Sequence, residues 1–278
     1  MHEPKMLNMG EPHVMAIVNV TPDSFYGASR NQLYEEAERS VSRAISEGAT
    51  IIDIGGYSSR PGAMEVDVEE EWRRVSMGLD AVRRAEGSVV VSVDTFRSAI
   101  VERAVEEYGT IMVNDISAGE IDDDMLAVVA RYGLRYVAMH MRGVPATMQS
   151  LTHYDNGVVA EVTDYFRRRV ADIEACGVAR EDIVIDPGFG FAKSTEQNME
   201  LMGALCHLRE LGYPLLVGVS RKSMIYRPLG ITAEESLPGS LAMAWEALQS
   251  GATILRVHDV AATRQIVDLY NYYKRFVR

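Results

Sequence analysis

Hydrophobic residues occur in eight short runs that are nearly continuous rather than alternating with polar residues. Runs of this kind predict parallel strands that are covered on both faces. They span residues 14–20, 50–56, 89–95, 111–116, 136–141, 183–188, 214–220 and 254–259. The segments between them carry apolar residues at helical spacing, and several of these segments end at glycine. Ser194 and Gln197 form a candidate capping box at the start of one predicted helix, 194–212.

Eightfold alternation of strand and helix allows either an open doubly wound sheet or a closed barrel. A dinucleotide-binding sheet would show G-x-G-x-x-G after its first strand, whereas this strand runs into N-V-T-P-D-S-F. The length of 278 residues also matches the roughly 250 of a closed barrel. We therefore predict an α/β protein with a single (β/α)8 TIM-barrel domain over residues 1–278, in which residues 1–13 form a loose lead-in.

Composition narrows the functions that this barrel could serve. A net charge of −12 argues against binding to nucleic acid or to an anionic membrane surface. The N-terminus lacks the apolar core of a signal peptide, and no apolar run approaches the roughly 18 residues of a membrane span. Cys176 and Cys206 have no metal-binding spacing, so we expect two buried, reduced thiols and a cytoplasmic location.

Polar residues follow every predicted strand, at the end where barrels of this kind build their active sites. Packing alone does not require polar groups at all eight positions. At Asp115 and Asp259, capping of the following helix is an equally good explanation, and His140 is as well interpreted as a buried structural histidine. The main candidates are Asn19, Asp94, Asn114, Asp186, Lys222, Arg256 and His258.

These side chains, with Arg60 from the loop after the second strand, divide into two kinds of chemistry. An oxygen-rich anion, with a hard cation such as Mg²⁺ on an amide oxygen, would suit Asn19, Arg60, Arg256 and His258. A planar nitrogen heterocycle would suit the donors and acceptors of Asp94, Asn114, Asp186 and Lys222. Phe191 either lies along a flat ring or anchors its own loop.

The loops after the first two strands are long and punctuated by proline and glycine, and we expect them to close over a substrate. No Ser/His/Asp or Cys/His set and no zinc spacing stands out in the sequence. Direct displacement is therefore favoured over covalent catalysis.

Eight of the motifs at the predicted strand ends resemble those of the dihydropteroate synthase family. They appear in the family's order over about residues 14 to 262 and read NVTPDSF, DIGGYSSRPGA, VSVDTF, VNDISAG, MHMRGVPATMQ, DPGFGFAKSTEQN, GVSRKSMI and RVHDV. The resemblance implies a transferase that joins 4-aminobenzoate to (7,8-dihydropterin-6-yl)methyl diphosphate, giving 7,8-dihydropteroate and diphosphate in folate biosynthesis. It further implies an SN1-like reaction in which Mg²⁺ assists departure of the diphosphate.

The same resemblance implies a role for each matching residue. The pterin would be bound by Asp94, Asn114, Asp186, Lys222, Phe191, Met139 and Ile116. The diphosphate would be bound by Arg60, Arg256, His258 and, through Mg²⁺, Asn19. The 4-aminobenzoate would contact Phe25, Ser59, Pro61, Lys222 and Ser223. Catalysis would rest on Asp94, Lys222, Asn19, Arg256 and His258.

Two positions in the second loop depart from the family pattern. Tyr57 stands where the family has a glutamate, which puts any role of that acid in doubt, and Ser59 replaces a threonine but keeps its hydroxyl. Sulfonamides are implied as competitors of 4-aminobenzoate, and a homodimer is implied as the assembly. The last helix carries an apolar stripe that we expect to pack on the barrel and also to serve an interface: Ile266, Leu269, Tyr270, Tyr273 and Phe276.

Three other functions remain as alternatives. A methyltransferase that moves a methyl group from methyltetrahydrofolate to a corrinoid protein could share the pterin-binding residues, but it has no use for a diphosphate site. A non-catalytic pterin- or partner-binding barrel would be expected to lack Asn19, Asp94 or Lys222, all of which are present. A phosphosugar enzyme would hold its phosphate near the last two strands, where Arg256 and His258 lie.

Overall fold

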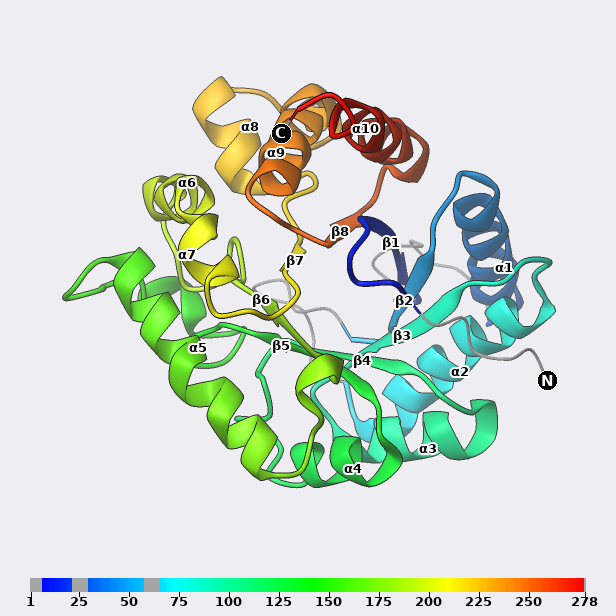
Figure 1. Ribbon diagram of the computed structural model, residues 1–278. Coiled ribbons are helices and arrows are strands. Elements are labelled where there is room, and N and C mark those ends of the chain that lie inside the picture. The colour runs from blue at the N-terminus through cyan, green and yellow to red at the C-terminus, as the bar shows by residue number, and fades with distance from the viewer. Residues whose placement is uncertain (1–6, 22–29, 58–65, 278) are drawn as a thin grey trace.

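The computed structural model describes residues 7–21, 30–57 and 66–277, which form eight parallel strands in a nearly closed barrel surrounded by helices, as predicted (Figure 1). The strands are β1 (His13–Asn19), β2 (Ile51–Gly55), β3 (Val90–Asp94), β4 (Met112–Asp115), β5 (Arg135–Met139), β6 (Ile183–Asp186), β7 (Leu216–Val217) and β8 (Ile254–Val257). The helices are α1 (Arg30–Ser46), α2 (Val68–Arg84), α3 (Ser98–Tyr108), α4 (Met125–Tyr132), α5 (Val158–Ala175), α6 (Thr195–Gly203), α7 (Leu205–Arg209), α8 (Ser223–Leu229), α9 (Leu237–Gln249) and α10 (Val260–Tyr273).

The barrel closes between β6 and β7, where the pairing is weakest. The hydrogen-bonded order runs β6-β5-β4-β3-β2-β1-β8-β7, and a single parallel bridge between Ile185 and Leu215 joins its two ends. Strand β7 is much shorter than the predicted run of 214–220. The chain leaves the sheet early because it turns at Val219, whose carbonyl oxygen accepts from Lys222 N at 3.1 Å.

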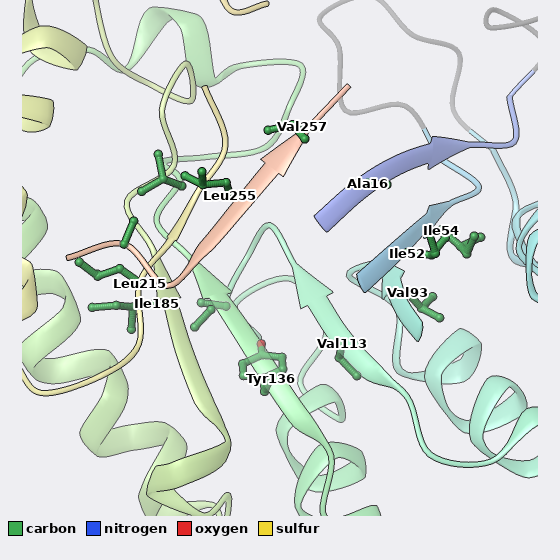
Figure 2. Close-up of a cluster of buried hydrophobic side chains, with 14 of the residues drawn as sticks. Ala16, Ile52, Ile54, Val93, Val113, Tyr136, Ile185, Leu215, Leu255 and Val257 are labelled. Carbon is green, nitrogen blue, oxygen red and sulfur yellow. The ribbon is translucent and has the colours of Figure 1, made fainter. Parts of the chain in front are cut away.

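Apolar side chains on the outer face of the strands form the main core. Figure 2 shows them between the strands and the surrounding helices, and Ile52, Ile54, Val93 and Val113 are all fully buried. Both faces of each strand are therefore covered, which explains why the strands appear in the sequence as continuous apolar runs.

The inside of the barrel is apolar only at its amino-terminal end. A cluster of inward-facing side chains fills this floor: Met15, Ile51, Met112, Val137, Val184, Leu216 and Ile254. Leu7 belongs to the same cluster and is only 8% exposed, and Asn8 O lies 3.0 Å from His13 Nε2. Within the predicted lead-in, Leu7 is thus packed against the floor, while residues 8–12 lie outside helices and strands.

The helices begin and end largely where the sequence signals indicated. Ser194 and Gln197 form the predicted capping box, and Gly133 ends α4 in the left-handed conformation. Two differences concern short elements. The single helix predicted over 194–212 breaks at Ala204 into α6 and α7, and the short helix α8, which contains Pro228, was not predicted.

Burial corrects the expectation of buried cysteines and divides the apolar stripe of the last helix into a packed and an exposed part. Cys176 and Cys206 are both exposed rather than buried, because they lie on the outer sides of their helical segments. In α10, Ile266 and Tyr270 pack against the core, but Leu269 is 55% exposed and Phe276, beyond the helix, is 71% exposed. Within residues 7–21, 30–57 and 66–277, no helix is long and apolar enough to cross a membrane.

Candidate active site

Polar side chains line the inside of the barrel at the carboxyl ends of its strands. In the sheet register, Asn19 pairs with Gly55, Gly55 with Asp94, and Asp94 with Asn114. Across the barrel, β6 ends in Asp186, and Arg256 lies on β8. Side chains alternate along a strand, so these groups point inward at every second position above the apolar floor. The structure thereby brings the predicted heterocycle residues to one rim.

Asp53 contacts two of these residues directly and a third through Arg256, although the sequence analysis did not single it out. Its Oδ2 atom accepts from Arg256 Nε at 2.6 Å and from Asn114 Nδ2 at 3.0 Å. Arg256 Nη2 in turn donates to Asp94 Oδ2 at 2.6 Å. Asp53 is fully buried in the middle of β2. A carboxylate inside a continuous apolar run, two residues before the strand end, was the signal that could have revealed it.

The charges of this network bear on the predicted roles of Arg256 and Asp94. Two of the three guanidinium nitrogens of Arg256 donate to carboxylates, so its predicted contact with a diphosphate would use Nη1 or the second hydrogen of Nη2. Burial raises the pKa of Asp94 to about 7, with Asp53 and Glu71 adding to the effect and Arg256 opposing it. Asp94 is therefore expected to gain a proton near neutral pH, which would weaken its ion pair with Arg256.

An apolar patch lies beside the polar rim. It consists of Ile116, Met139, Met141, Met148 and Ala192, with Phe96 and Phe191 packed against it. Three of the predicted pterin contacts, Ile116, Met139 and Phe191, are thus found in one cluster. Lys222 Nζ lies 4.9 Å from the centre of the Phe191 ring and donates to Phe189 O. The patch offers flat apolar surface directly next to an ammonium group.

The Lys222 ammonium is expected to make ligand binding depend on pH on the alkaline side. Burial lowers the pKa of Lys222 to about 8, against the opposing effect of Asp186. If the positive charge contributes to ligand binding, affinity for the pterin falls as the pH rises through about 8. Calorimetric titration between pH 6.5 and 9.5 measures this, and Lys222→Arg should move the fall to higher pH because arginine stays charged. A flat profile for the wild type would show that the charge is not used.

The loop after β6 is held in place by a buried lysine that sequence reasoning overlooked. Lys193 Nζ lies 2.9 Å from His140 Nδ1, 3.0 Å from Gly188 O and 3.0 Å from Phe191 O. Gly188 has φ +68, and a Cβ there would lie 2.0 Å from His140 O, so only glycine fits. Its N–H donates to Asp186 Oδ1 at 2.8 Å. His140 is therefore a buried structural histidine rather than a residue of the polar rim.

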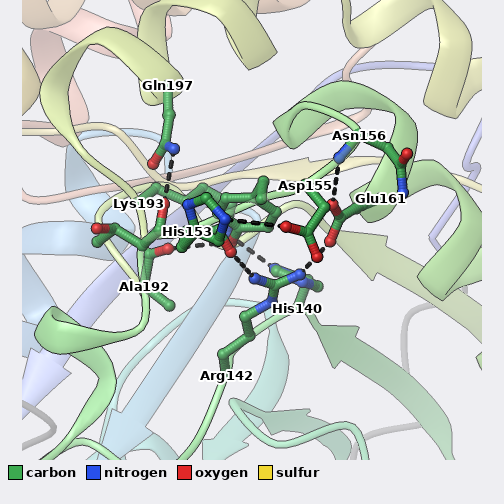
Figure 3. A network of polar contacts seen from close by, with 11 residues as sticks. His140, Arg142, His153, Asp155, Asn156, Glu161, Ala192, Lys193 and Gln197 are labelled. Carbon is green, nitrogen blue, oxygen red and sulfur yellow. Dashed lines mark hydrogen bonds and ion pairs between the residues drawn. The ribbon is translucent and has the colours of Figure 1, made fainter.

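Further polar contacts tie this loop to the one after β5 (Figure 3). Tyr154 donates to Ala192 O at 3.0 Å, and Gln197 Nε2 donates to Thr152 O at 2.7 Å. Arg142 donates to both His153 O and Glu161, which fixes the far side of the β5 loop. Hydrogen bonds thus hold the segments after β5 and β6 together next to Asp186.

The predicted anion side of the site is described only in part. His258 N and Nδ1 each lie 3.2 Å from Ser220 Oγ, which links the residue directly after β8 to the turn after β7. Ser223 begins α8 directly after Lys222. Phe25, Ser59, Arg60 and Pro61 lie outside the described residues, so their predicted roles stay predictions. Tyr57, which replaces the family's glutamate, makes an edge-on ring contact with Phe96 at 5.3 Å.

Gly55 gives a steric test of this rim, because it lies between two predicted catalytic residues. A Cβ at Gly55 would lie 2.9 Å from Asn19 Oδ1 and 3.7 Å from Asp94 Cβ. Gly55→Ala is therefore expected to displace Asn19 and to lower kcat/KM at least about tenfold, because small misplacements of reacting groups cost rate. Steady-state kinetics checks this. Gly203→Ala, where a Cβ would meet nothing within 4 Å, is the matched control and should leave kcat/KM unchanged.

Asp115 and Asp259 have structural partners of their own. Asp115 accepts from Ser117 N at 2.7 Å and from Tyr136 OH at 2.7 Å, and so fixes the turn after β4. Asp259 makes no side-chain cap to α10; it pairs with Arg221, with Nη2 and Oδ1 2.5 Å apart. Capping of the next helix is therefore not the role of Asp259, and neither residue joins the rim network.

Comparison with known proteins extends over nearly the whole chain. A family described as pterin binding enzyme matches residues 15–258. The dihydropteroate synthase of Escherichia coli (strain K12) is 43% identical over 257 residues, covering 92% of this chain and 90% of the relative.

Solved structures agree with the sequence comparison. Xanthomonas albilineans dihydropteroate synthase with 4-aminobenzoic acid superposes with a TM-score of 0.88 at 41% identity, covering 96% of this chain and 95% of the other. Yersinia pestis dihydropteroate synthase in a sulfonamide drug complex gives a TM-score of 0.87 at 36% identity, covering 97% and 96%. The fold, the motifs and these comparisons together show that the chain belongs to the pterin-binding enzyme family, among the dihydropteroate synthases, which are transferases.

Proposed function

We propose that this protein condenses 4-aminobenzoate with (7,8-dihydropterin-6-yl)methyl diphosphate, releasing diphosphate and forming 7,8-dihydropteroate for folate synthesis. The observation that carries the proposal is the set of Asp94, Asn114 and Asp186 at the carboxyl ends of β3, β4 and β6, with Lys222 next to the apolar patch at Phe191. A carboxylate accepts from the amino-pyrimidine edge of a pterin, and an ammonium donates to its carbonyl and ring-nitrogen acceptors. The family membership supports the same substrate class.

The departing diphosphate would be met by Asn19, Arg256, His258 and Arg60. Asn19 Oδ1 is a hard oxygen ligand at the rim, and Mg²⁺ commonly takes one or two protein oxygens together with substrate phosphates. Among the described residues there is no cluster of three or more His, Cys, Asp or Glu suited to a metal, so a magnesium ion would take most of its ligands from substrate oxygens and water. When bound, it would neutralise charge on the leaving group. Calorimetry tests this: Mg²⁺ should strengthen diphosphate binding in the wild type but not in Asn19→Ala.

The carbon–oxygen bond to the diphosphate would break before the aminobenzoate nitrogen attacks. Asp94 is suited to stabilise the resulting pterin cation, and the neutral aniline nitrogen needs no strong base. An oxygen-18 label in the oxygen that joins the pterin methylene carbon to phosphorus is then expected to move into the non-bridging positions of that same phosphate before 4-aminobenzoate is added. Retention of the label in the bridge would indicate concerted displacement instead.

The 4-aminobenzoate site would be formed by Lys222 and Ser223 with Phe25, Ser59 and Pro61. The structure of the Xanthomonas relative contains 4-aminobenzoic acid, and that of the Yersinia relative contains a sulfonamide drug. These neighbours support binding of 4-aminobenzoate here and competition by sulfonamides. Steady-state inhibition with a sulfonamide should raise the KM for 4-aminobenzoate and leave kcat unchanged.

Diphosphate release is the test of the proposed activity. Purified protein with the pterin diphosphate and Mg²⁺ should release diphosphate continuously only when 4-aminobenzoate is supplied. Release without any dependence on 4-aminobenzoate would contradict the proposal. A corrinoid-dependent methyltransferase or a non-catalytic pterin-binding barrel would bind a pterin and release no diphosphate.

We also propose that two copies of the chain form a homodimer through the end of α10. Leu269, Tyr272 and Phe276 are more than half exposed there, although they are large apolar side chains. Contiguous apolar surface of this kind is more often covered by a partner than left in water. Sedimentation velocity should give twice the mass of one chain for the wild type and a single chain for Leu269→Asp with Phe276→Asp.

A further inference from the structure

Asp53 is a buried carboxylate that no substrate would reach directly. It lies on β2 one inward position below Gly55, and its side chain has no solvent exposure. Both of its hydrogen bonds go to the same oxygen, Oδ2, from Arg256 Nε at 2.6 Å and from Asn114 Nδ2 at 3.0 Å. Among the described residues Oδ1 has no hydrogen-bond partner. The carboxylate therefore acts on the rim through two other side chains.

The contact with Asp53 fixes which end of the Asn114 amide is offered to a ligand. A carboxylate only accepts hydrogen bonds, so the Asn114 atom 3.0 Å from Oδ2 must be the NH₂ group. The carbonyl oxygen at the other end of the planar amide is then the group left for a ligand. Asn114 consequently selects a heterocycle that presents an N–H at this position, and it disfavours one that presents a bare ring nitrogen.

The same carboxylate fixes the plane of Arg256. With Nε held by Asp53 and Nη2 held 2.6 Å from Asp94, the guanidinium is clamped at two points on one edge. Arg256 therefore forms ion pairs with both Asp53 and Asp94, rather than with Asp94 alone. Without Asp53, both the direction of the Asn114 amide and the electrostatic setting of Asp94 would change.

We propose that Asp53 is a positioning residue of the active site: it sets the acceptor face of Asn114 and the guanidinium plane of Arg256, and so contributes to selection of a pterin-like heterocycle with an N–H donor. This inference rests on the proposed function for the identity of the ligand. The hydrogen bonds from Asn114 and Arg256 to Asp53 are present whatever reaction the site catalyses.

Asp53→Leu is the test, because it keeps about the size of the side chain while removing both its charge and its hydrogen-bond acceptors. Ser92→Ala is the matched control: Ser92 is the β3 neighbour of Asp53 in the sheet register, is fully buried, and its hydroxyl has no hydrogen-bond partner among the described residues. Asp53→Leu is expected to weaken binding of the dihydropterin diphosphate, measured by calorimetry, about tenfold. Ser92→Ala should stay within about twofold of the wild type, and the KM for 4-aminobenzoate should change little in either variant.

A double-mutant cycle separates positioning from general loss of structure. If Asp53 acts partly through Asn114, the effect of Asp53→Leu on pterin affinity should shrink to about threefold or less in an Asn114→Ala background. The same tenfold effect in both backgrounds would overturn the proposal, as would unchanged affinity in Asp53→Leu. A wild type that binds no pterin would instead overturn the proposed function. If Asp53→Leu does not fold, Asp53→Glu, which keeps the charge but shifts the carboxylate, replaces it in the same cycle with the same expected outcomes.

Discussion

Replacing Asp186 by alanine is expected to weaken binding of the dihydropterin at least a hundredfold. Asp186 is 6% exposed, and among the described residues its carboxylate accepts only one hydrogen bond, from Gly188 N at 2.8 Å. Most of its accepting capacity is thus left for a ligand. Loss of a buried charged acceptor leaves the ligand's donors without partners, which costs about 3 kcal/mol or more.

Calorimetric titration of the wild type and of Asp186→Ala with the pterin measures this loss directly. Asp259→Asn is the control, because Asp259 also follows a strand but pairs with Arg221 rather than joining the rim. Its pterin affinity should equal that of the wild type. Near-normal affinity in Asp186→Ala would remove Asp186 from the binding site and with it the assignment of the heterocycle half.

Replacing Asp94 by asparagine is expected to reduce the rate of the chemical step about a hundredfold to a thousandfold, with a smaller effect on pterin affinity. Asparagine keeps an oxygen that accepts from Arg256 Nη2, so the rim geometry is retained while the negative charge is lost. Charge placed where a cation develops is among the largest contributions to catalysis. The effect should therefore appear in single-turnover rates rather than in binding.

The pH profile provides a second readout for Asp94. Because burial raises the pKa of Asp94 to about 7, the ionised form is lost as the pH falls through 7, and kcat/KM of the wild type should decline on that side. Asp94→Asn carries no ionisable group there, so its residual activity should lack this decline. An unchanged acid limb in Asp94→Asn would assign the limb to another group.

The architecture and the rim could be predicted because they follow from local patterns. Continuous apolar runs mark strands that are buried on both faces, and a barrel directs the residues at their carboxyl ends to one side. Asp94, Asn114 and Asp186 were therefore found as strand-end residues, without knowledge of any contact. Their grouping into a heterocycle half depends on hydrogen-bonding capacity, which is a property of residue type.

Other features depend on contacts between distant segments and were missed. Asp53 lies within an apolar run, and its importance becomes visible only when Asn114 and Arg256 are placed around it. In the sequence, nothing distinguishes Lys193 from an ordinary loop residue, because its burial results from the packing of the loops after β5 and β6 around it. Burial of Leu7 against the floor and exposure of the two cysteines likewise depend on how helices and termini pack, which helical periodicity alone does not fix.

The central claim is that the rim of this barrel joins a pterin to 4-aminobenzoate, and one measurement tests it most directly. Mass spectrometry of a reaction containing the pterin diphosphate, 4-aminobenzoate and Mg²⁺ should show 7,8-dihydropteroate formed in equal amount to the diphosphate released. Asp186→Ala should form almost none at the same substrate concentrations. Diphosphate release without 7,8-dihydropteroate, or no turnover of either substrate by the wild type, would contradict the claim.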